Sequence, residues 1–250
     1  MASSIAVAGK GGTGKTTISA LLISALVARK KGPVLAVDAD PDANLGSLLG
    51  IKPEQTIGDL REEVLREMKN FPAGMTKANY VEAGLHQLIE EAAGFDLITM
   101  GRGEGSGCYC SLNNIIRKFS GDLTPSYPWV VIDNEAGLEH ISRRTTSDID
   151  ALIIVVTENP LSFQSALAIE EITKSLNNRI MHTYVVSNMI RESRLEAVKA
   201  RVNELNTDFI CNIPHDEKLE ECIFNGESVL SITDSPAMTA IHQILEKVGG

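Results

Sequence analysis

A glycine-rich run near the start of the chain constrains the fold more than any other feature. It reads Gly9-Lys10-Gly11-Gly12-Thr13-Gly14-Lys15-Thr16-Thr17 and joins the apolar run Ile5–Ala8 to the helical pattern Lys15–Arg29. The run fits G-x-x-x-x-G-K-[ST], whose glycines let backbone N–H groups close around phosphate oxygens at a helix N-terminus. Lys15 is expected to reach the β- and γ-phosphates of a nucleotide, and the Thr16 hydroxyl to ligate Mg²⁺.

Short apolar runs alternate with helical patterns along the rest of the chain, and several runs are continuously apolar, as in strands covered on both faces. This alternation predicts a single α/β domain over 1–250, with a doubly wound, mostly parallel sheet of about seven strands and helices on both faces. The polar stretch 52–77 is less regular and fits a helical insertion over the sheet edge. The expected strands are Ile5–Ala8, Val34–Asp38, Asp96–Met100, Trp129–Asp133, Ala151–Val156, His182–Ser187 and Phe209–Ile213; the expected helices are Lys15–Arg29, Asn79–Glu91, Leu161–Leu176, Ser193–Leu205 and Ala237–Val248.

The charge and the apolar content exclude several function classes. A net charge of −10 opposes binding to nucleic acid and to anionic membranes, so neither partner is expected. No apolar run approaches the roughly 18 residues of a bilayer span. The first residues, Met1-Ala2-Ser3-Ser4, lack the basic region and cleavage site of a signal peptide, so a cytoplasmic location is expected.

Two clusters of acids follow expected strands. One strand runs into Asp38-Ala39-Asp40-Pro41-Asp42, and acids at the carboxyl end of a parallel strand face the ligand crevice. Another strand ends at Asp133 in the manner of a Walker B acid, whose carboxylate holds Mg²⁺ through water. The next residues, Asn134-Glu135-Ala136-Gly137, are expected to form a switch that follows the γ-phosphate. For Asp42 the alternative is a helix cap, if Asn44–Leu49 is a helix.

The four cysteines divide into a close pair and two separate residues. Cys108 and Cys110 lie in a glycine-flanked loop at about 101–112, and side chains two residues apart in an extended segment point the same way. A closed thiolate site for Zn²⁺ or Ni²⁺ needs four sulfurs, and a second copy of the chain across a two-fold axis would supply the other two. The alternative for the pair is plain packing. Cys211 and Cys222 lie in apolar patterns and are expected to be core residues.

Lys10 occupies the first variable position of the loop, from which a lysine projects outward. The run Lys10-Gly11-Gly12-Thr13-Gly14-Lys15-Thr16-Thr17 resembles that of the deviant Walker A, or MinD/ParA-type, ATPases. In that family this lysine reaches the nucleotide across an ATP-closed homodimer; the alternative here is a solvated surface lysine. The resemblance implies ATP hydrolysis with Lys10, Lys15 and Asp40 as catalytic residues, Asp40 orienting the attacking water and Asp38 lying near the Mg²⁺ shell. It also implies that Asn188 and Pro214 contact adenine, although both residues are common in strand-end turns.

The cysteine pair makes the chain similar to one branch of that family, the nickel-insertion ATPases that mature carbon monoxide dehydrogenase and the associated acetyl-CoA synthase. The resemblance runs through Asp38-Ala39-Asp40-Pro41-Asp42 and Cys108-Tyr109-Cys110 to Ala136-Gly137-Leu138-Glu139-His140. It implies ATP, Mg²⁺ and Ni²⁺ or Zn²⁺ as ligands, a homodimer, and a client nickel enzyme as partner. Asn134-Glu135 is less diagnostic and leaves the details of the second switch open.

Two other functions compete within the same family. An ATPase that positions division or partition machinery usually ends in a basic amphipathic helix or carries a basic DNA patch, whereas Ile241–Gly250 has one basic residue. An iron–sulfur electron donor like the nitrogenase iron protein takes single cysteines from two loops. Cys108 could fill one loop, but Asp133–Arg144 contains no cysteine for the other.

Overall fold

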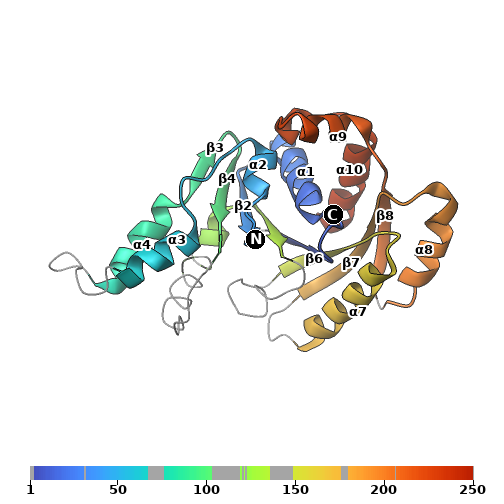
Figure 1. The fold of residues 1–250 in the computed structure, drawn as a ribbon, viewed down its shortest axis with the longest axis horizontal. Helices are drawn as coiled ribbons and strands as arrows, with labels where there is room; N and C mark the ends of the chain where they lie inside the picture. The colour runs from blue at the N-terminus through green and yellow to red at the C-terminus, as the bar shows by residue number, and fades with distance from the viewer. Residues whose placement is uncertain are drawn as a thin grey trace.

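The chain folds around one eight-stranded sheet (Figure 1). The computed structural model describes residues 3–30, 32–66, 76–102, 119, 121, 123–135, 149–175, 180–205 and 207–249. The strand order is β3-β4-β2-β5-β1-β6-β7-β8, and every neighbouring pair is parallel except β3 with β4. The strands are β1 (Ser3–Gly9), β2 (Val34–Ala39), β3 (Glu90–Ala92), β4 (Phe95–Thr99), β5 (Trp129–Asn134), β6 (Ile149–Val156), β7 (Ile180–Asn188) and β8 (Asp208–Ile213).

All seven expected strands are present, so the predicted mostly parallel α/β sheet is confirmed. The sequence predicts about seven strands, and the described residues form eight. The additional strand is β3, which pairs antiparallel with β4. The expected helix Asn79–Glu91 is wrong at its end, since α4 (Lys77–Gln87) stops and Glu90 already pairs with Leu97. Gly94, with φ of 93°, closes a two-residue turn that folds the chain back on itself, a conformation that costs glycine little.

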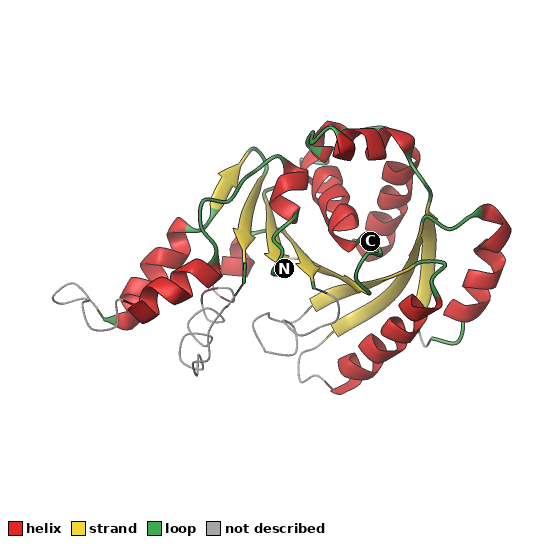
Figure 2. Cartoon of the chain, viewed as in Figure 1, coloured by secondary structure: helices red, strands yellow, loops and turns green. Residues whose placement is uncertain are grey.

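Helices cover both faces of the sheet (Figure 2). Side chains of β1 and β5 that point to one face pack with α1, α9 and α10, and those that point to the other face pack with α3, α4, α7 and α8. The α3–α4 pair extends beyond the sheet edge, where a helical insertion was expected from the polar stretch. No described helix is long and apolar enough to cross a bilayer. The helices are α1 (Lys15–Ala28), α2 (Leu45–Leu49), α3 (Ile57–Arg66), α4 (Lys77–Gln87), α7 (Pro160–Ser175), α8 (Leu195–Val202), α9 (Glu217–Phe224) and α10 (Pro236–Val248), with 3₁₀ turns at Thr124–Ser126, Glu192–Arg194 and Val229–Ser231.

Helix α1 is deeply buried and supports the loop that precedes it. Ten of the fourteen residues of α1 are buried, and their apolar side chains pack between the sheet and α10. Replacing a buried leucine such as Leu22 with alanine would cost about 2–5 kcal/mol, so the position of this helix is strongly fixed. The turn at its N-terminus is therefore held against a rigid base.

The carboxyl ends of three adjacent strands meet beside this turn. Asp38 on β2 lies opposite Asp133 on β5 in the strand register, and on its other side it lies opposite Thr99 on β4. All three side chains are buried and share the sheet face that packs on α1, because their positions alternate in step along parallel strands. Strand pairing therefore places two acids in contact range at the end of the loop–helix unit.

Candidate functional site

The loop between β1 and α1 is a tight, glycine-dependent turn. Gly12 and Gly14 have φ of 80° and 90°, in the left-handed region, and Gly14 is the N-cap of α1. At Gly9 a Cβ atom would meet the carbonyl oxygen of Val155 at 2.7 Å, so the close approach to β6 requires glycine. The Thr13 hydroxyl donates to the Lys10 carbonyl oxygen at 2.8 Å and closes the turn. A glycine turn of this kind at a helix N-terminus suits a phosphate group, because such turns offer backbone N–H donors and positive potential.

A cavity of about 700 Å³ opens over this turn. Lys15 lies in its wall and is only 6% exposed, so its charge is available to a ligand inside the cavity and shielded from bulk solvent. Acids enter the same cavity from the loop after β2, and the turn after α9 closes the far side. The lining residues are Gly11, Gly12, Gly14, Lys15, Thr16, Thr17, Asp40, Asp42, Asn44, Ser47, Leu48, Glu135, Ile223, Gly226 and Glu227.

Asp38 organises the loop that follows its own strand. Its Oδ1 accepts the Asp40 N–H at 3.2 Å, and its Oδ2 accepts the Leu45 N–H at 2.9 Å. Burial raises the pKa of Asp38 to about 7, and the nearby Asp133 charge adds to the shift, while the two backbone hydrogen bonds oppose it. Both carboxylate oxygens are therefore used within the loop.

Asp133 has one carboxylate oxygen that is available to a ligand. Its Oδ1 accepts the Ser19 hydroxyl at 3.0 Å, whereas its Oδ2 is buried and has no hydrogen-bond partner in the described part of the chain. Burial raises the pKa of Asp133 to about 6, although the Thr16 and Ser19 hydroxyls and the Lys15 charge oppose the shift. A buried, unpaired carboxylate oxygen beside the Thr16 hydroxyl fits a hard divalent cation or its bound water.

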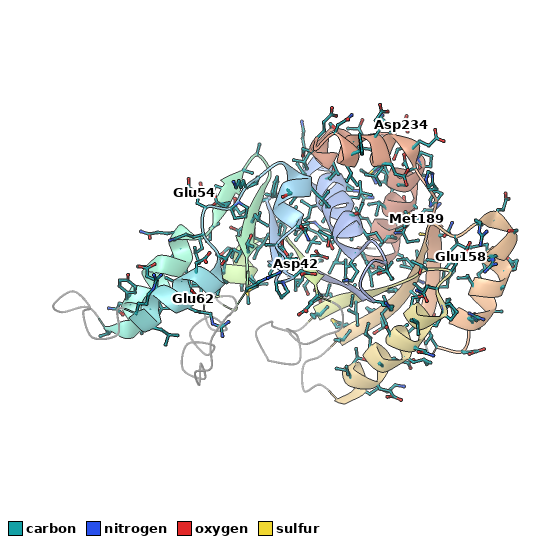
Figure 3. The ribbon with its side chains drawn as sticks, in the orientation of Figure 1. Asp42, Glu54, Glu62, Glu158, Met189 and Asp234 are labelled. Carbon is teal, nitrogen blue, oxygen red and sulfur yellow. The ribbon has the colours of Figure 1, made fainter. Side chains whose placement is uncertain are left out.

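Asp42 does not cap α2, so the capping alternative for this residue is wrong. The first turn of α2 is held by Asp38 through the Leu45 N–H, and Asn44, the N-cap, makes no side-chain cap. Asp42 instead pairs with Arg102 at 2.7 Å, and its N–H donates to Asp40 Oδ1 at 2.9 Å. Asp42 is therefore neither a cap nor buried, and it lies where the α3–α4 side of the molecule meets the sheet (Figure 3).

Asn188 and Pro214 line a second, smaller cavity of about 120 Å³ that adjoins the loop. The side-chain amide of Asn188 is buried and donates to the Thr13 carbonyl oxygen at 2.9 Å. Asn188 thus holds the phosphate-loop backbone, a contact that the sequence does not predict. Its neighbour Met189 has a positive φ of 53° and borders the same cavity, as does Ile223, which also lines the larger one.

Several residues of the site could not be identified from the sequence. Ser19 bonds to Asp133 across 114 positions, and its only sequence signal is that it follows Lys15 by one helical turn. Thr99 Oγ1 and Asn134 Oδ1 are buried and lack partners among the residues described, while Asn134 Nδ2 donates to the Val7 carbonyl oxygen at 3.1 Å. Such contacts depend on strand register, which no short motif encodes.

The structure describes two of the four cysteines. Cys211 and Cys222 are free and buried, which confirms the core prediction, and burial raises the pKa of the Cys211 thiol to about 11. Cys108, Cys110 and Gly137 lie outside the described residues. Within the described ranges, no group of three or more His, Cys, Asp and Glu side chains is arranged to hold a metal ion.

Comparison with known proteins agrees with this site. Residues 4–229 match the family model for the CobQ/CobB/MinD/ParA nucleotide binding domain. The chain is 39% identical over 247 residues to an uncharacterized ATP-binding protein of Methanocaldococcus jannaschii, covering 98% of this chain and 97% of that protein. It is 29% identical over 259 residues to the carbon monoxide dehydrogenase accessory protein CooC of Rhodospirillum rubrum, covering 98% and 97%.

A solved structure gives the same result for the fold. The MinD cell division protein of Aquifex aeolicus superposes with a TM-score of 0.73 at 23% identity, covering 100% of this chain and 98% of that one. The family match extends over most of the chain and includes the loop, both acid clusters and Asn188. The chain belongs to the CobQ/CobB/MinD/ParA family of nucleotide-binding domains and is a P-loop ATPase.

Proposed function

We propose that this ATPase is a metallocentre-maturation factor that couples ATP-driven dimer closure to binding of Ni²⁺ or Zn²⁺ for a client nickel enzyme. The main observation in support is the position of the carboxyl end of β4 beside the acids of the nucleotide site. Its last residue, Thr99, lies opposite Asp38 in the strand register, and the chain reaches Cys108 nine residues later. The chain therefore leaves β4 beside the acids of the nucleotide site, and the cysteine pair follows in the sequence. The similarity to CooC over nearly the full length of both chains supports the same function.

Different residues of the chain would have different roles in ATP hydrolysis. The loop backbone and the buried Lys15 ammonium would hold the β- and γ-phosphates, and Asp40 would orient the attacking water. Asp38 would keep the Asp40 loop in place through its two backbone contacts. Thr16 and Asp133 are the residues that fit Mg²⁺, because Asp133 Oδ2 is unpaired among the described residues. When bound, Mg²⁺ supplies positive charge that neutralises the phosphate oxygens.

The base and the second subunit complete the proposed site. Asn188 and Pro214 border the small cavity next to the loop, which would receive adenine. Lys10, whose carbonyl oxygen is fixed by Thr13, would reach the nucleotide of the partner subunit in the closed dimer. The same closure would bring two copies of Cys108 and Cys110 together around one ion, because four thiolates complete a closed Zn²⁺ or Ni²⁺ site.

The decisive experiment is metal analysis of anaerobically purified protein with and without ADP or ATP. We expect one Ni²⁺ or Zn²⁺ per two chains, lost in Cys108→Ser and Cys110→Ser, with dimerisation of the nucleotide-free protein weakened as well. Iron and sulfide in place of nickel would favour the iron–sulfur alternative. ATP-dependent pelleting with lipid or DNA, with no metal bound, would favour a positioning ATPase. One metal per monomer that survives both cysteine substitutions would refute the proposed ligands.

A further inference from the structure

The exposed ion pair between Arg102 and Asp42 joins two parts of the chain that are 60 residues apart. Arg102 Nη2 lies 2.7 Å from Asp42 Oδ1, and both side chains are more than half exposed. Asp42 stands in the loop after β2, three residues before α2, and it lines the nucleotide cavity. Arg102 follows the end of β4 and is the last described residue before the segment that contains the cysteine pair.

Asp42 is in turn bonded to the residue expected to orient water. Its backbone N–H donates to Asp40 Oδ1 at 2.9 Å, and the Ala43 N–H donates to the Asp40 carbonyl oxygen at 3.0 Å. Ala43 has a φ of 51°, and a left-handed conformation costs a residue with a Cβ about 1–2 kcal/mol. The turn is thus held in a conformation that its own backbone does not favour. A second anchor on Asp42 would therefore help to fix the Asp40 carboxylate.

The backbone that carries Arg102 is firmly attached. The Met100 N–H donates to the Asp38 carbonyl oxygen at 2.8 Å, and the Met100 carbonyl oxygen accepts the Gly58 N–H at 2.9 Å. Gly58 packs so closely on the Arg102 carbonyl group that any Cβ there would collide with it, and Gly101 packs on Thr56 in the same way. Arg102 therefore reaches Asp42 from a base fixed both to β2 and to the start of α3.

We infer that Arg102 is a positioning residue for ATP hydrolysis, which holds Asp40 through Asp42. The inference rests on the proposed role of Asp40 in orienting the attacking water.

The test compares steady-state ATP hydrolysis by wild-type protein, Arg102→Ala, Arg102→Lys and Asp42→Asn at about 0.15 M salt. Exposed ion pairs contribute little, so we expect Arg102→Ala to lower kcat about 1.5- to 5-fold and to change KM for ATP less than twofold. Arg102→Lys should retain most of the activity, because it keeps the charge. The double variant Arg102→Ala with Asp42→Asn should be no slower than either single variant, since both remove the same contact.

A matched control is Lys174→Ala, which removes an ion pair of 2.8 Å to Glu170 from a side chain of similar exposure at the far end of α7. The inference is overturned if Arg102→Ala keeps the wild-type kcat, if Lys174→Ala loses as much, or if the two site substitutions are additive. Asp40→Ala, assayed in the same way, separates the two claims. A wild-type kcat for that variant would refute the role of Asp40, whereas a loss in Asp40→Ala with none in Arg102→Ala would refute only the inference about Arg102.

Discussion

Replacing Asp133 with asparagine is expected to stabilise the nucleotide-free protein at pH 8 and to abolish turnover. The Asp133 carboxylate is buried, and its Oδ2 lacks a partner among the described residues. A second buried acid, Asp38, lies opposite it on β2. Asparagine has nearly the same shape and keeps an oxygen for the Ser19 hydroxyl, but it carries no charge. The substitution therefore removes a buried anion with little change in packing, and it removes the oxygen that we assign to Mg²⁺.

The expected gain depends on pH in a definite direction. Burial raises the pKa of Asp133 from 3.8 to about 6, so between these values the folded protein holds a proton that the unfolded chain has released. Stability linked to this group is therefore fully present below about pH 4 and lost as the pH rises through about 6. The difference corresponds to about 3 kcal/mol at most above pH 7, and to about half of that at pH 5. For a domain of this size each kcal/mol moves Tm by about 2–4 °C.

Thermal unfolding in EDTA at pH 5 and pH 8 measures the effect. The Tm of Asp133→Asn should exceed that of wild type by up to about 10 °C at pH 8, and by about half as much at pH 5. Asp234→Asn, at an exposed acid, is the control and should match wild type at both pH values. Mg·ATP at 100 times its Kd should stabilise wild type by about 2.7 kcal/mol and the variant by less. A lower Tm for Asp133→Asn at pH 8, or an equal gain at both pH values, would refute the reasoning.

Three other substitutions test the nucleotide site. Asp40→Ala should still bind ATP in a filter or fluorescence assay but should lose turnover by about 100-fold or more, because it removes water orientation and leaves the phosphate loop intact. Lys10→Ala mixed with Asp40→Ala should regain partial activity, since one composite site of a mixed dimer is intact; no recovery despite subunit exchange would make Lys10 a local surface residue. Gly14→Ala should weaken ADP binding about 10-fold or more in titration, because a Cβ there meets the Asn188 amide and φ is 90°.

Features that depend on local pattern could be predicted from the sequence. The strand–loop–helix unit around Gly9–Thr17 is recognisable because glycine conformation, the helix start and the buried strand all leave marks within a few adjacent positions. The acids Asp38 and Asp133 could be placed for the same reason, since each lies at the carboxyl end of an apolar strand. The short strand β3 could not be predicted, because Glu90 and Glu91 have low strand propensity. The turn at Gly94 is the only local sign of it.

Contacts between distant segments could not be predicted, because they depend on how the sheet is ordered. Asn188 reaches Thr13 across 175 positions, and this contact exists because β7 lies two strands from β1 with its carboxyl end at the same edge. The family resemblance implies that Asn188 contacts adenine. The sequence does not show that the same amide supports the phosphate loop, so one side chain has both a structural contact and a proposed ligand contact.

The strand order β4-β2-β5-β1 bears on the proposed coupling of metal binding to hydrolysis. The loop after β1 would hold the phosphates, the acids lie at and just after the ends of β2 and β5, and β4 is the next strand beyond β2. Because parallel strands end at one edge, the segment that begins after β4 starts beside the acids without any long connection. The Met100 hydrogen bond to Asp38 and the Arg102 pair with Asp42 are consequences of that adjacency. Placing the cysteine pair after β3, β6, β7 or β8 would have separated it from the Asp40 loop by at least one strand.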